Sequence, residues 1–194
     1  MSSTLAPVLR DYLVRYQQMA IRQTGRRPVA RLRTPMEDAL LLPGCQKPGY
    51  AFWQPVEWKN NKAPVGKAEG FHQSIVDYVS MCQFYEICFE LPVAASGSPL
   101  SFLHGRVFEC YANTQSNPPS RVFEEAALYR REHPEWPLSF CMAATCDAGE
   151  PLLLMLRAED GGAFVVRSMT DEKPVELKVG LERLLPQVRF VYTI

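Results

Sequence analysis

Residues 51–58 read AFWQPVEW, and the rest of the chain is organised around this stretch. From Tyr50 to Glu57 successive side chains alternate between two faces, a pattern typical of an extended strand with one buried face. Because Pro55 has no N–H to donate to a ladder, we expect the strand to lie at the edge of a sheet or to end there.

The aromatic residues of this stretch leave its role open. Trp53 and Trp58 are two of the three tryptophans in the chain. Gln54 stands between Trp53 and Pro55, where a polar side chain indicates either a buried hydrogen bond or an exposed recognition contact. The stretch is therefore either the edge of the core or a partner surface, because edge strands and exposed aromatic residues are both used to bind other proteins.

Helices and strands flank the stretch on both sides. Apolar residues at three- and four-residue steps predict a helix over residues 4–24, which Gly25 ends. Residues 26–36 are predicted to form a surface loop, and residues 38–42 a short strand or half a turn of helix. On the other side the spacing predicts a helix over residues 68–82, followed by a strand over residues 83–91.

The second half of the chain changes from helical to alternating patterns. A strand is expected within residues 103–112, and Ser120 is expected to cap a helix over residues 121–132. Three apolar runs then predict an antiparallel meander covered on both faces; they span 138–144, 151–157 and 163–169.

The turns of this meander read CDAGE and AEDGG, in which we expect glycine to adopt a positive φ. A last helix is predicted to carry Leu177 or Val179 together with Leu181, Leu184 and Leu185.

Length, composition and element order together predict one α+β domain over residues 1–194. The chain is 47% hydrophobic and 22% charged, so it is not disordered, and its length allows a full core. Helices before, between and after the strands favour a single, mostly antiparallel sheet flanked by helices.

The charge balance argues against a nucleic-acid partner. Lys and Arg number 21 and Asp and Glu number 21, so the net charge is zero, without the basic surplus of a nucleic-acid-binding protein. One basic cluster is either a solvated helix end and loop or a site for anionic lipid or an acidic partner; it contains Arg22, Arg26, Arg27, Arg31 and Arg33. The chain has no apolar run of membrane-spanning length and no signal-peptide pattern, so we expect a cytoplasmic location.

Motifs of catalysis are not found in the sequence. It has no glycine-rich phosphate loop and no GxSxG elbow, and His72, His104 and His133 have no partner at metal-ligand spacing. None of the six cysteines forms a CxxC pair, so we expect small buried residues, without a disulfide framework, a zinc site or another cofactor. An enzyme with a cysteine nucleophile stays a third hypothesis, because six cysteines are many for a cytosolic chain of this size.

The remaining function class is a protein-binding module. Aromatic residues at an interface centre and acidic residues near an edge strand are the candidate contacts. These candidates are Trp53, Gln54, Glu57, Trp58, Tyr85 and Glu86.

Several segments of the chain resemble the Syd family, which belongs to the SUKH superfamily. They are LRDYLVRYQQM from residue 9, FWQP from residue 52, GFHQSIVDYVSMCQFYE from residue 70, FCMAATCDAGEPLLLMLRAEDGG from residue 140 and GLERLLPQV from residue 180. The resemblance implies an α+β domain that binds another protein and is not an enzyme. A Syd protein docks peripherally on SecY, the channel subunit of the bacterial protein translocon, at the cytoplasmic face of the inner membrane.

The same superfamily also implies an alternative. Its members serve as immunity proteins that neutralise a polymorphic toxin by covering its active site. Syd uses an acidic face against basic loops of SecY, whereas the net charge here is zero. A negative patch on one face is still possible if the acids of the middle third gather there; these are Glu57, Glu69, Asp77, Glu86 and Glu90.

Overall fold

The computed structural model describes residues 5–31, 40–57, 70–92, 100–112, 119–167 and 173–192. Its helices are α1 (Leu5–Thr24), α2 (Gln73–Met81), α3 (Pro119–Glu132) and α4 (Leu181–Leu184), with a 3-10 turn, η2 (Ser101–Leu103). Its strands are β1 (Val29–Arg31), β2 (Leu41–Leu42), β3 (Tyr50–Trp53), β4 (Val56–Glu57), β5 (Cys82–Glu90), β6 (Val107–Ala112), β7 (Ser139–Thr145), β8 (Leu152–Arg157), β9 (Gly162–Arg167), β10 (Val175–Gly180) and β11 (Arg189–Val191).

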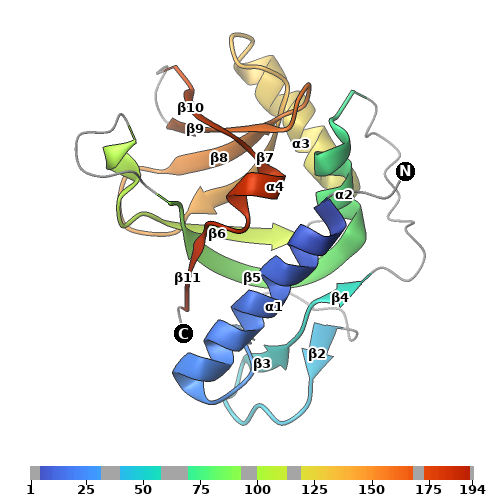
Figure 1. Ribbon diagram of the computed structural model, residues 1–194, viewed down its shortest axis with the longest axis vertical. Coiled ribbons are helices and arrows are strands. Elements are labelled where there is room, and N and C mark those ends of the chain that lie inside the picture. Colours follow the sequence, from blue (N-terminus) through green and yellow to red (C-terminus); the bar gives the residue numbers. More distant parts are fainter. Residues whose placement is uncertain are drawn as a thin grey trace.

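The main sheet is curled and antiparallel, with the strand order β10-β9-β8-β7-β6-β5-β11. A second, small sheet has the order β1-β3-β2 and lies beside one end of α1 (Figure 1). Helices flank the main sheet, so the predicted α+β class is confirmed.

Residues 51–57 of the stretch AFWQPVEW join the two sheets instead of forming one strand. β3 ends at Trp53 and lies in the middle of the small sheet, so the prediction of an edge strand is wrong. The chain leaves this sheet at Gln54 and Pro55, since a proline cannot continue the ladder. It resumes as β4, which pairs with the first residues of β5, so the expectation that the strand ends at the proline is confirmed.

The larger core lies between the main sheet and the helices α1, α2 and α4. The predicted inner face of α1 is buried there, and the Tyr16 ring stacks on Trp53 at 5.8 Å and contacts Phe190 of β11 at 5.4 Å. Tyr16 also donates its hydroxyl to the Glu86 carbonyl oxygen at 3.3 Å. α1 therefore holds both sheets and the last strand together.

A second core lies on the other face of the same sheet. α3 packs on β7, and the apolar residues beneath it and the following loop are Trp136, Leu153, Met155, Phe164 and Val166. Burying a side chain of this size contributes about 1.5–3 kcal/mol relative to leaving it exposed. The predicted meander of β7, β8 and β9 is thus confirmed and is buried on both faces.

The C-terminal helix is much shorter than the spacing of leucines predicts. Leu177 and Val179 belong to β10, which pairs with β9, and the helix α4 begins only at Leu181. Pairing with the sheet overrides the helical spacing, and Gly180 is extended, with φ −97° and ψ 177°. Lys178 has φ 57° where the register of the pair shifts, which marks a bulge.

Other boundaries also differ from the predictions. α2 begins at Gln73, after Gly70 at φ 89°, and α3 begins at Pro119, so Ser120 lies inside the helix and is not its cap. β1 lies in the segment predicted to be a loop, and β11 follows the last helix.

One of the two glycine predictions in the meander turns is confirmed. Gly161 has φ 69°, whereas Gly149 does not have a positive φ. A Cβ at Gly149 would lie 2.8 Å from the Arg106 guanidinium, so this glycine permits close approach instead.

Candidate functional site

The outer face of the main sheet continues beyond the cover of α3. Among the described residues, the core beneath α3 reaches β7 but includes no residue of β5 or β6. Ile87, Phe89 and Phe108 point inward and are fully buried, so the alternate residues of β5 and β6 point outward.

Strand pairing sets the neighbours on this outer face. Cys88 lies opposite Glu109 of β6 on one side and Val191 of β11 on the other. Two residues along β5, Glu90 lies opposite Arg189 and its carboxylate pairs with that guanidinium at 3.1 Å. We call this surface the outer acidic face and define it by Glu86, Cys88, Glu90, Glu109 and Cys146.

Carboxylates on β5 and β6 give the face its acidic character, although Arg189 offsets the charge of Glu90. Glu86, Glu90 and Glu109 are all half-buried on the two neighbouring strands. Acids gathered on one side of a sheet produce a negative potential that attracts cationic partners, even when the net charge of the molecule is zero. The arrangement suits recognition of a basic protein segment.

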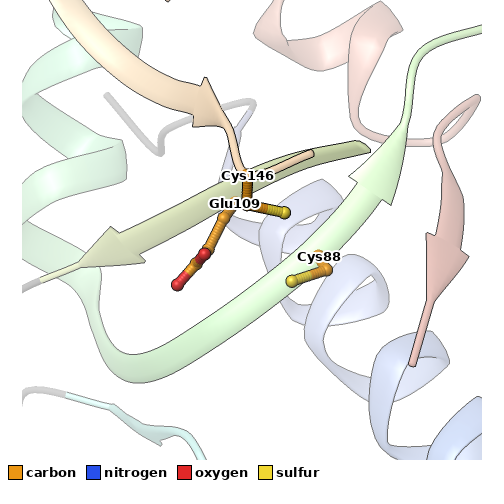
Figure 2. A group of neighbouring side chains, drawn as sticks. All are labelled: Cys88, Glu109 and Cys146. Atoms are coloured by element: carbon orange, nitrogen blue, oxygen red, sulfur yellow. The ribbon is translucent and has the colours of Figure 1, made fainter. Parts of the chain in front are cut away.

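Two thiols lie next to the Glu109 carboxylate. The ligand atoms of Cys88, Glu109 and Cys146 all lie within 4.8 Å of one another, and Figure 2 shows the three side chains coming from β5, β6 and the residue after β7. Cys88 is 3% exposed, whereas Cys146 is exposed to solvent. The Cys146 N–H donates to the Val107 carbonyl oxygen at 3.0 Å, which fixes the backbone at this point.

The surroundings of Cys146 shift its pKa. Burial, followed by the charge of Glu109, raises the pKa of Cys146, against the effect of its hydrogen bond with Cys88. Burial also raises the pKa values of Cys110 and Cys141 to about 12. Nucleophilic cysteines have lowered pKa values, so these environments do not favour a cysteine nucleophile.

The cysteines are only partly the buried residues that the sequence predicts. Cys88 and Cys110 are buried, Cys45 and Cys141 are half-buried, and Cys146 is exposed. No disulfide joins the five cysteines whose side chains the structure describes.

The structure does not bring the six candidate contact residues into one surface. Trp53 is 0% exposed, so it forms part of the core and offers no contact area, as in the first of the two alternatives for this stretch. Gln54 lies beside it, and its side-chain oxygen accepts a hydrogen bond from Arg27 at 3.2 Å. Glu86 lies on the outer acidic face, and its carbonyl oxygen accepts a hydrogen bond from the Tyr16 hydroxyl at 3.3 Å.

The other three candidates are described in part or lie outside the described residues. Glu57 and Tyr85 occupy β4 and β5, but their side chains are outside the description, as is the whole of Trp58.

The five acidic residues in the middle third of the chain also do not all share one face. Glu86 and Glu90 share the outer acidic face, whereas Asp77 lies on α2 and accepts a hydrogen bond from Gln73 at 2.8 Å. The Glu57 side chain and Glu69 are outside the described residues. Sequence reasoning missed Glu109, although a carboxylate between Phe108 and Cys110 in an apolar strand is a signal for an outward position.

A hollow of about 370 Å³ lies beside β8, β9 and β10. Arg157 crosses it and pairs with Asp160 at 3.0 Å and Glu176 at 2.5 Å. Three of the charged groups that line the hollow are thus paired within the protein.

Each of the three histidines has its own local surroundings. His72 accepts hydrogen bonds on Nδ1 at the start of α2, and His133 stacks on Trp136 with the ring centres 3.8 Å apart. His104 is exposed after η2.

Comparison of the chain with models of known protein families and with curated proteins gave no match. The resemblance to Syd therefore stays a prediction. Within the described part of the chain, none of the helices has the length and apolar character to cross a membrane.

Proposed function

We propose that the protein is a non-catalytic binding module that docks on SecY at the cytoplasmic face of the bacterial inner membrane. The sequence resemblance to Syd motivates the partner. The observation that carries the proposal is the gathering of Glu86, Glu90 and Glu109 on one sheet face of a chain with no net charge.

Electrostatics explains how such a face would work. Basic cytoplasmic loops would be attracted to the carboxylates, which raises the association rate and fixes the orientation of docking. Within a Debye length of roughly 8 Å at physiological salt, the attraction depends on these few acids and not on the balance of the whole chain. Zero net charge of the whole chain is therefore compatible with attraction between this face and basic loops.

Charge reversal tests the proposal. The double variant Glu86→Lys, Glu109→Lys should weaken binding to purified translocon in lipid nanodiscs by about tenfold or more, mainly through slower association. The double variant Glu132→Lys, Glu135→Lys makes the same change in net charge near the end of α3 and should bind like the wild type. Equal loss in both variants would contradict docking through the outer acidic face.

The alternative is an immunity protein, which the zero net charge favours over an acidic Syd protein. In that case the protein would co-purify with a soluble toxin from its host, inhibit its activity and show no affinity for the translocon. Measurement of both binding reactions on the same preparation separates the two functions.

A further inference from the structure

We propose that Cys88, Cys146 and Glu109 form a binding site for a zinc ion. This site goes beyond the proposed docking function and stands on the geometry of three side chains alone. The spacing of cysteines in the sequence does not reveal it, because the ligands come from β5, from β6 and from the residue that follows β7.

The separation of the ligand atoms suits a single ion. Zinc binds thiolate sulfur at about 2.3 Å and carboxylate oxygen at about 2.0–2.2 Å, so its ligands lie within about 4 Å of one another. The three atoms here lie within 4.8 Å before any ion draws them together. A small rotation of side chains completes the geometry, and the exposed position of Cys146 gives the ion a path from solvent.

The strand order of the sheet disfavours a disulfide between Cys88 and Cys146. Cys88 is on β5 and Cys146 follows β7, and both strands pair with β6, which lies between them. Their backbones are therefore about 9–10 Å apart, since neighbouring strands are spaced by about 4.8 Å. A disulfide needs Cα atoms within about 7 Å, whereas an ion between the sulfurs adds the missing length.

The donor set selects the metal. Two thiolates favour zinc or copper(I) over magnesium and calcium, and the carboxylate favours zinc over copper(I). Three protein ligands leave the fourth position of a tetrahedral ion for water.

Binding leaves the charge of the outer acidic face unchanged. Counted by formal charge, two thiols and one carboxylate carry one negative charge before binding. Each thiol releases one proton to solvent when it binds the ion. Two thiolates, one carboxylate and one divalent cation again sum to one negative charge, so the affinity for zinc should rise with pH.

The test titrates the reduced, metal-stripped full chain with Zn²⁺ against a chromophoric chelator, and with Co²⁺ in a parallel experiment. We expect one ion per chain, a thiolate-to-cobalt charge-transfer band and tetrahedral cobalt bands. Cys146→Ser and Glu109→Gln should each weaken zinc binding by at least tenfold. Because Cys146 is exposed, its serine variant is expected to fold.

Matched variants control for the loss of any thiol. Cys45→Ser and Cys141→Ser each remove a half-buried cysteine outside the cluster and should bind zinc like the wild type. Unchanged affinity in Cys146→Ser, or a cobalt complex without a charge-transfer band, would overturn the site. A disulfide between Cys88 and Cys146 would also overturn the zinc site. It would be seen if mild oxidation removed two hydrogens from the wild type but none from Cys146→Ser.

Discussion

At the scale of single residues, the best-defined electrostatic contact joins Arg106 to Asp147. The Arg106 Nε donates to both Asp147 oxygens, at 3.0 and 2.9 Å, and the N–H groups of Val107 and Gly149 donate to the same carboxylate at 3.1 Å. The hydrogen bond from Arg106 is the main reason why the pKa of Asp147 lies below its ordinary value. This contact holds the turn between β7 and β8 against the start of β6, next to Cys146.

Asp147→Asn should lower the free energy of unfolding at neutral pH by about 1–2 kcal/mol, because it removes the ion pair and keeps the shape. A carboxylate with a lowered folded-state pKa stabilises the fold above its unfolded value of about 3.9 and stops doing so as the pH falls through the folded value. The difference between wild type and variant should therefore be constant above about pH 5 and disappear in acid. Urea unfolding across this pH range measures it.

Asp11→Asn provides a control on an exposed helix surface. Asp11 pairs with Arg15 at 3.0 Å one turn along α1, and its side chain is 62% exposed. The change should cost less than about 0.5 kcal/mol. A loss in Asp147→Asn that persists at low pH would show that the carboxylate charge is not the cause.

At the scale of elements, the turn between β8 and β9 docks on the start of α2. Gly161 has φ 69°, and a Cβ there would lie 2.6 Å from the Ser74 Oγ, while the His72 N–H donates to the Ala158 carbonyl oxygen at 2.6 Å. Ser74 is buried and its Oγ lies 2.8 Å from His72 Nδ1, so it has no room to move aside. The glycine thus serves both the turn and the contact.

Gly161→Ala should lower the free energy of unfolding by about 2–4 kcal/mol, from the strained φ together with the clash. Gly105→Ala has almost the same φ, 71°, but nothing within 4 Å of its Cβ, so it should cost only about 1 kcal/mol. The difference between the two variants in thermal or urea unfolding gives the part of the lost free energy that comes from the clash. Equal losses of unfolding free energy in the two variants would mean that the close contact between the turn and α2 contributes nothing.

Local patterns predict some elements well and miss others for physical reasons. The helix α1 and the meander of β7, β8 and β9 follow from residue spacing, because each buries a regular apolar stripe in a continuous segment. β10 is misjudged because its residues also fit helical spacing and only pairing with β9 decides between the two structures.

The candidate site, too, could be predicted from the sequence only in part. Glu86 is found from the acidic middle third, but Glu109 and Cys146 join it only through the pairing of β5, β6 and β7. Trp53 fails as a contact residue because the chain turns at Pro55 and buries it behind Tyr16.

At the scale of the whole molecule, the two faces of one curled sheet differ. Its inner face carries the larger core against α1, α2 and α4, and α3 covers only the part of its outer face over β7 to β9. The part of the outer face that α3 does not reach bears the acids of β5 and β6, Cys88 of β5 and, just after β7, Cys146. The central claim is that this outer acidic face is the docking surface.

Hydrogen exchange with and without the translocon tests that claim most directly. The account predicts slower exchange on binding in β5, β6 and β11, with little change in the exposed side of α1 and in the small sheet. Protection confined to α1 or to β1, β2 and β3 would contradict docking through the outer acidic face.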